Sequence, residues 1–86
     1  MEKTIRILNE EGLHARPAGI FVKKAGEFQS KIEIRVGDQL KNAKSIMGLM
    51  ALGLKKDAEI TLVATGPDEA QAIEALSALV ARKFEG

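Results

Sequence analysis

Residues 32–42 read Ile-Glu-Ile-Arg-Val-Gly-Asp-Gln-Leu-Lys-Asn, and they predict two strands of an antiparallel sheet. The first five residues alternate apolar and charged side chains, which is typical of a strand with one buried face and one solvated face. Gly37-Asp38 is a hairpin-type turn, and Gln39 to Asn42 is expected as a short following strand. The inward phase of that strand is unclear, because Leu40 and Ala43 do not fall on one face.

Two more strands and a first helix are predicted on either side of this hairpin. Thr4 to Leu8 and Ile60 to Ala64 alternate in the same way and indicate strands. Pro17 suits the first turn of a helix, where its missing N–H costs nothing. One face of that helix is apolar at i, i+3, i+4, i+7 and i+10, through Ala18, Phe21, Val22, Ala25 and Phe28.

Capping residues indicate two further helices. Ser45 is a favoured N-cap and Gly53 a favoured residue after a helix end, so a helix of about two turns is expected between them. The last helix is expected from about Glu69 to Phe84, with Asp68 and Gln71 as a variant of the capping box. Its inner stripe comprises Ile73, Leu76, Val80 and Phe84, while Arg82 and Lys83 in the final turn should complement the helix dipole.

The resulting order, β-α-β-β-α-β-α, predicts one small domain over residues 1–86 of the α/β (α+β) class. Four strands with one buried face and helices on one side make a two-layer sandwich. A β-α-β step can skip a strand position and leave room for a later strand. The sheet can then be antiparallel throughout.

Composition excludes several classes of function. The chain has no cysteine and one histidine, so neither a disulfide framework nor a tight zinc site is expected. A net charge of +1 and only three Phe as aromatic residues do not suggest nucleic-acid binding. No apolar run approaches the roughly 20 residues of a membrane span, and no signal-peptide pattern is present. We therefore expect a cytoplasmic protein without membrane insertion.

The main candidate site is the heptad Gly-Leu-His-Ala-Arg-Pro-Ala at residues 12–18. A helix N-terminus has free backbone N–H groups and a positive dipole end, which favour an anion. The neutral ring of His14 is a nucleophile, and Arg16 lies two residues further on. Together they suggest a phosphoryl group carried on the ring, although an ordinary exposed loop histidine would give the same heptad.

The heptad, together with residues 44–53, resembles the two sequence motifs of the HPr family. HPr is the histidine-containing phosphocarrier of the bacterial sugar phosphotransferase system. Residues 12–18 are similar to its phosphorylation-site motif, and Lys-Ser-Ile-Met-Gly-Leu-Met-Ala-Leu-Gly at 44–53 is similar to its serine motif. The resemblance covers essentially the whole chain and implies an open-faced sandwich of four antiparallel strands under three helices.

For the site, the resemblance implies a phosphotransfer intermediate rather than a stand-alone enzyme, without cofactor or metal. His14 would accept the phosphoryl group on Nδ1 from enzyme I and pass it to the IIA domains of sugar-specific enzymes II. Arg16 would match the active-site arginine. Ser45 would match the regulatory serine of Gram-positive-type bacteria, which HPr kinase/phosphorylase phosphorylates. The phosphorylated form would be a corepressor for catabolite control protein A, and this would link the protein to catabolite repression.

Partner docking is expected on the short helix after Ser45, because a two-turn helix that is apolar nearly all round cannot bury every side chain. The expected docking residues are Met47, Met50, Leu49, Phe21, Lys23 and Lys24. We expect a monomer. Two alternatives stay open, namely a purely regulatory binding module acting through Ser45 and a paralogue in a nitrogen-related phosphotransfer chain.

Overall fold

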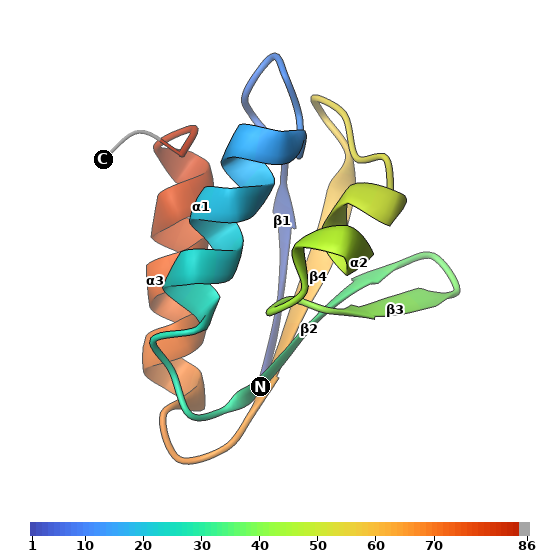
Figure 1. The fold of residues 1–86 in the computed structure, drawn as a ribbon. Helices are drawn as coiled ribbons and strands as arrows, with labels where there is room; N and C mark the ends of the chain where they lie inside the picture. Colours follow the sequence, from blue (N-terminus) through green and yellow to red (C-terminus); the bar gives the residue numbers. More distant parts are fainter. Residues whose placement is uncertain (85–86) are drawn as a thin grey trace.

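The computed structural model describes residues 1–84, which form a four-stranded antiparallel sheet with three helices on one face (Figure 1). The elements are β1 (Glu2–Arg6), α1 (Ala15–Ala25), β2 (Lys31–Val36), β3 (Gln39–Asn42), α2 (Ile46–Ala51), β4 (Glu59–Thr65) and α3 (Glu69–Ala81). The predicted βαββαβα open-faced sandwich is confirmed. Gly86 and its neighbour at 85 lie outside the described residues.

The strand order in the sheet is β1-β4-β2-β3, so the last strand of the chain inserts between the first two. All three pairings are antiparallel. In the central pair Ile34 lies opposite Leu62 and Ile32 opposite Ala64, and all four side chains are buried. The other face carries polar pairs such as Glu2 with Arg35, joined at 2.9 Å. The sheet therefore has one apolar face, and the helices occupy it.

The hairpin turn is confirmed, with Val36 paired to Gln39 and Gly37 at a φ of +59°. The structure also settles the phase of β3. Leu40 lies opposite Arg35 on the outer face and is 51% exposed. Ala43 follows the end of the strand and is buried, and its N–H donates to the carbonyl of Ile32.

Two element boundaries differ from the prediction. β1 begins at Glu2 and ends at Arg6, since the next residue, Ile7, leaves the ladder and bonds through its backbone to Asp57 and Ala58. Leu8 lies outside the strand and is exposed.

The end of α3 also differs. The helix ends at Ala81, so its predicted extension to Phe84, and the placing of Arg82 and Lys83 within its final turn, are wrong. Lys83 and Phe84 are left-handed, with φ of 56° and 63°. The Phe84 N–H donates to the carbonyl of Leu79 at 2.9 Å, which closes the helix end. This turn keeps Phe84 buried without helical continuation.

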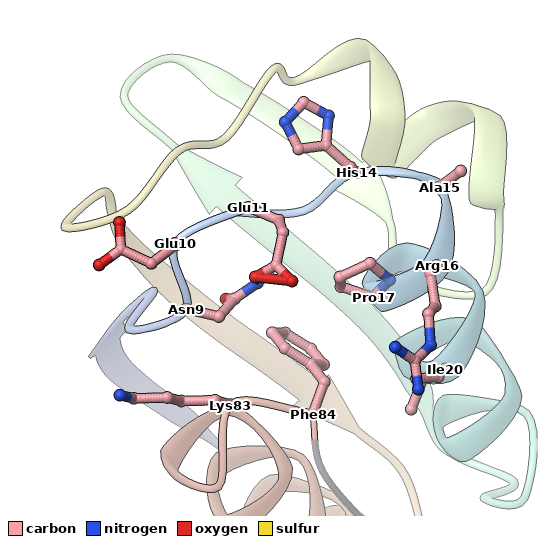
Figure 2. A pocket seen from close by; sticks show the side chains of 10 residues that line it. All are labelled: Asn9, Glu10, Glu11, His14, Ala15, Arg16, Pro17, Ile20, Lys83 and Phe84. Atoms are coloured by element: carbon pink, nitrogen blue, oxygen red, sulfur yellow. The ribbon is translucent and has the colours of Figure 1, made fainter.

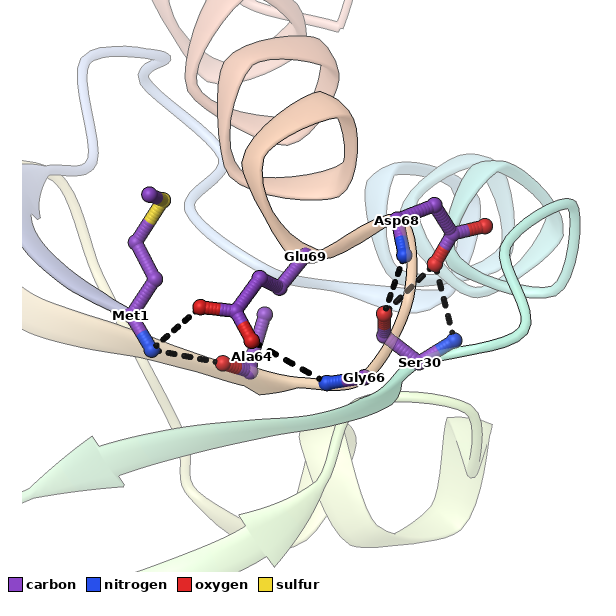
Figure 3. A network of polar contacts seen from close by, with 6 residues as sticks. All are labelled: Met1, Ser30, Ala64, Gly66, Asp68 and Glu69. Carbon is purple, nitrogen blue, oxygen red and sulfur yellow. Dashed lines mark hydrogen bonds and ion pairs between the residues drawn. The ribbon is translucent and has the colours of Figure 1, made fainter.

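The predicted capping box at the start of α3 is wrong, because the Asp68 carboxylate makes no bond to its own helix. It instead accepts hydrogen bonds from the backbone N–H groups of Gln29 and Ser30, both at 2.9 Å, and from the Ser30 hydroxyl (Figure 3). Gln71 makes no bond to this cap. Asp68 thus ties the start of α3 to the segment that enters β2.

A neighbouring group of bonds surrounds the first residue of α3. Glu69 accepts a hydrogen bond from the Gly66 N–H at 3.2 Å and pairs with the Met1 ammonium at 3.2 Å (Figure 3). That ammonium also donates to the Ala64 carbonyl at 2.8 Å. The start of β1, the end of β4 and the start of α3 are therefore joined by polar contacts.

We predict that Asp68→Asn lowers the free energy of unfolding at neutral pH but not in strong acid. The Ser30 hydroxyl first, and then the backbone N–H groups, lower the pKa of Asp68 from its ordinary value of 3.8. The native state therefore binds fewer protons than the unfolded state. The contribution of this carboxylate to the free energy of unfolding is complete above pH 3.8 and is lost as the pH falls towards the lowered pKa. Urea unfolding of both proteins across this range measures the difference.

The control is Asp38→Asn, in the exposed hairpin turn, where the carboxylate makes no hydrogen bond to any residue from 1 to 84. It should stay close to the native stability at every pH. An Asp68→Asn deficit that is equally large in strong acid would contradict the ionic origin of the effect.

Candidate functional site

His14 is the N-cap residue of α1 and has extended backbone angles, with φ −81° and ψ −173°. Its carbonyl accepts the first helical hydrogen bond, from the Ala18 N–H at 2.8 Å. The ring is exposed and makes no capping bond. Figure 2 shows it pointing away from the guanidinium of Arg16, which extends towards Ile20. The ring is thus accessible to a protein that approaches this end of the molecule.

Two backbone donors lie directly after the ring. Among residues 1–84, no acceptor is bonded to the N–H groups of Ala15 and Arg16, and Pro17 has no N–H. The Ala18 N–H is already used within the helix. An 11-residue helix places its positive dipole end here, and its first turn contains no acidic residue. This end of α1 can therefore stabilise an anion next to His14.

The loop that carries His14 is fixed against the segment between α2 and β4. Gly12 has a φ of +68°, and a Cβ added there would lie 2.3 Å from the Leu54 carbonyl oxygen. The next N–H, that of Leu13, donates to the same oxygen at 3.1 Å. Both leucine side chains are buried. Only glycine permits this approach, and no local sequence pattern indicates that residue 54 is the partner.

A pocket of about 520 Å³ opens beside the loop (Figure 2). It lies between the loop, the first turns of α1 and the turn after α3, and it is lined by Asn9, Glu10, Glu11, His14, Ala15, Arg16, Pro17, Ile20, Lys83 and Phe84. The predicted site did not include Phe84, which comes from the distant C-terminal turn, nor Asn9, which lies in the same loop as His14 but whose burial no local pattern indicated.

The charges at the rim of this pocket are mixed. A hydrogen bond from Lys56, 2.9 Å from Glu10, lowers the pKa of that exposed carboxyl group. Arg16 and Lys83 supply positive charge, and the guanidinium of Arg16 forms no hydrogen bond or ion pair with any residue from 1 to 84. Its long side chain is therefore able to turn towards a group bound at the ring.

Ser45 lies at the N-cap of α2, as predicted, and its hydroxyl accepts a hydrogen bond from the Gly48 N–H at 3.2 Å. The helix that follows presents apolar side chains to solvent. Met47 is 81% exposed and Met50 is 46% exposed, and Ile46 is partly exposed beside them. α2 packs against α1, so this apolar surface and the helix that begins after His14 are neighbours (Figure 1).

Two of the predicted docking residues cannot contact a partner directly. Phe21 and Leu49 are both 0% exposed and form part of the core under α1 and α2, so this expectation is wrong. Helical periodicity turns Leu49 inward although its neighbours face solvent. Lys23 is exposed, while Lys24 is half-buried and lies 3.4 Å from Glu27.

No cluster of three or more His, Asp or Glu side chains suited to a metal ion occurs within residues 1–84. In the same part of the chain, no helix has the length and apolar character needed to cross a membrane.

Comparison with known proteins identifies similar chains. Residues 1–82 match the family model described as PTS HPr component phosphorylation site. The chain is 49% identical over 84 residues to a phosphocarrier protein HPr of Treponema pallidum, covering 96% of this chain and 94% of that protein. The structure of an HPr from Thermoanaerobacter tengcongensis superposes with a TM-score of 0.95 at 48% identity, covering 98% of this chain and 94% of that one. One from Bacillus anthracis has a TM-score of 0.88 at 40% identity, over 91% and 93% of the two chains.

We predict that Gly12→Ala is much more destabilising than Gly37→Ala, although both glycines have positive φ. A Cβ at Gly37 would meet no atom within 4 Å. That variant should therefore lose about 1 kcal/mol of stability, which is the cost of the left-handed backbone conformation alone. A Cβ at Gly12 would also collide with the Leu54 carbonyl, and the total should reach about 3 kcal/mol. Chemical denaturation of the two variants measures the free energies of unfolding, and equal losses would contradict the close approach.

Proposed function

We propose that His14 is the residue that carries the phosphoryl group in this chain, which belongs to the HPr family of phosphocarriers in the sugar phosphotransferase system. The observation that carries this proposal is an exposed imidazole at the N-cap of α1 beside two unbonded backbone N–H groups. The family implies enzyme I and IIA proteins as partners. His14 is also the only histidine of the chain.

In the proposed reaction the lone pair of Nδ1 on the neutral ring attacks the phosphorus of phospho-enzyme I. The bond from phosphorus to the donor nitrogen breaks as the new P–N bond forms, and the donor recovers its electron pair. The N–H groups of Ala15 and Arg16 would then donate to the phosphate oxygens.

The guanidinium of Arg16 is proposed to offset the charge of the phosphoryl group during transfer. Arginine can bind two oxygens of a phosphate at once. Its side chain is exposed and points away from the ring, so it has to rotate towards it once the phosphoryl group arrives (Figure 2). The partner supplies the other half of the reacting site.

The onward transfer is proposed to reach IIA domains of sugar-specific enzymes II, in the cytoplasm and from a monomeric carrier. Docking is proposed on the apolar surface formed by Ile46, Met47 and Met50, with Lys23 and Lys24 available to acidic partners.

Ser45 is proposed as a regulatory phosphorylation site for an HPr kinase/phosphorylase, with catabolite control protein A as the reader of that form. A phosphate at an N-cap agrees with the dipole of the following helix, so the fold should tolerate it. The hydroxyl already accepts a bond from Gly48, a position that a phosphate oxygen could also occupy.

The two alternatives differ from this proposal in measurable ways. A purely regulatory module would accept no phosphate from enzyme I, and the exposed ring of His14 favours the carrier instead. A nitrogen-related paralogue would accept it and fail to pass it to a sugar-specific IIA domain. Intact-mass measurement with enzyme I, phosphoenolpyruvate and such a IIA domain separates all three.

We predict that the native chain gains one phosphoryl group from enzyme I and phosphoenolpyruvate, and that His14→Ala gains none. The phosphate should be labile in acid and stable in base, as expected of a P–N bond. Phosphate that persists in His14→Ala would assign the acceptor to another residue.

Arg16→Ala serves as the comparison in the same experiment, because it retains the acceptor. It should gain the same mass of one phosphoryl group at a lower rate, with stability within about 0.5 kcal/mol of native since the side chain is exposed. An unchanged rate would show that the guanidinium takes no part.

We predict that Ser45→Asp stays folded but accepts phosphate from enzyme I more slowly, with a deficit that shrinks as salt increases. The added charge would lie beside the proposed docking surface, where it repels an acidic partner and must be desolvated on docking. Salt screens such a charge over about 8 to 10 Å at moderate ionic strength. Initial rates at low and high salt measure the effect.

Met47→Ala is the matched variant, because it removes apolar contact without changing charge. It should slow transfer with little salt dependence. A folded Ser45→Asp that matches the native rate at low salt would leave the serine as a helix cap only.

A further inference from the structure

Asn9 is one of the two buried polar residues among residues 1–84, and it lies in the loop that leads to His14. Its side chain is 4% exposed, and Nδ2 donates to the Gly12 carbonyl at 2.8 Å. The Gly12 N–H donates back to the Asn9 carbonyl at 3.1 Å. The two bonds close residues 9–12 into a turn and leave little freedom for its last residue.

The orientation of the His14 ring depends on this turn, because no residue from 1 to 84 hydrogen-bonds the ring itself. The backbone on its N-terminal side is held by Gly12 and Leu13, and on its C-terminal side by the Ala18 bond to its carbonyl. A turn that loosened at Gly12 would therefore move the ring relative to the N–H groups at the start of α1.

We propose that Asn9 is a positioning residue for phosphoryl transfer, which acts by holding the Gly12 carbonyl and through it the backbone of His14. This proposal rests on the proposed function of His14. The side-chain hydrogen bonds of Asn9 go to Gly12 and Glu11, not to the ring or to the N–H groups of Ala15 and Arg16, so Asn9 acts through the backbone rather than on the reacting atoms. It fixes where the acceptor lies when a partner docks.

The side chain of Asn9 acts through its hydrogen-bond donor, Nδ2. Oδ1 of Asn9 is buried and has no hydrogen-bond partner within residues 1–84, whereas Nδ2 bonds Gly12 and lies 3.5 Å from the Glu11 carboxylate. An ionised aspartate of the same shape would present an oxygen to the Gly12 carbonyl and repel it. A protonated carboxyl group can donate, so it would restore the bond.

The experiment compares Asn9→Ala and Asn9→Asp with native protein as substrates of enzyme I. A loosened turn should lower kcat about tenfold or more, while KM changes little because the docking surface on α2 is untouched. The deficit of Asn9→Asp, expressed relative to native at each pH, should shrink as the pH is lowered and the carboxyl group becomes protonated. Hydrogen exchange of the Leu13 amide should quicken in both variants.

Ile73→Val is the control for a general loss of stability. It shortens a buried side chain near the start of α3, whereas the pocket is lined by Lys83 and Phe84, which follow the end of that helix. It should keep the native kcat. Circular dichroism confirms that each variant is folded at the assay temperature.

Three outcomes would overturn the proposal. The first is a folded Asn9→Ala with native kcat, and the second is an Asn9→Asp deficit that does not shrink in acid. The third is an Ile73→Val variant that is as stable as Asn9→Ala and shows the same loss of kcat. Failure of the function proposed for His14 is seen separately. In that case the native chain takes up no phosphate, or His14→Ala still does, whatever kcat the Asn9 variants show.

Discussion

The single apolar face of the sheet is the constraint on which the other features depend. In the central β2–β4 pair, Ile34 and Leu62 lie opposite one another and fully buried, while the other face carries ion pairs such as Glu2 with Arg35. All three helices must then lie on the apolar side. α1 packs against both α2 and α3 there, which leaves the N-terminus of α1 at an edge of the layer. The acceptor proposed in this chain stands at that edge.

For the proposed acceptor, exposure and a well-defined position are opposing requirements, and the loop at residues 9–14 meets both. The ring of His14 is open to a partner and has no hydrogen bond of its own in the described chain. Its backbone, however, is held by buried contacts from Asn9, Gly12 and Leu13, the last bonded to Leu54. Rigidity is thus supplied beneath the site, where it does not obstruct docking.

The short helix α2 combines two properties in six residues. Its N-cap, Ser45, satisfies a backbone donor, and its outer side exposes Met47 and Met50. Leu49 attaches the same helix to the core. A charge placed on the serine would therefore change the surface proposed for docking without removing the contact that holds the helix in place.

The sequence by itself determined the order of elements, the hairpin at Gly37, the cap at Ser45 and the start of a helix beside His14. These features depend on alternation, helical spacing and capping chemistry, all of which act within a few residues. The proposed reacting residues could also be identified, because His14 and Arg16 are only two positions apart in the chain.

Only the tertiary structure decided which residues form contacts between segments that are distant in the sequence. Asp68 bonds residues 29 and 30 instead of its own helix, Gly12 meets Leu54, and Phe84 closes the pocket beside the loop from a left-handed turn. The inward direction of Phe21 and Leu49 was decided by packing in the same way. Local patterns do not specify such contacts, since a donor or an apolar surface becomes available only when distant segments are packed together.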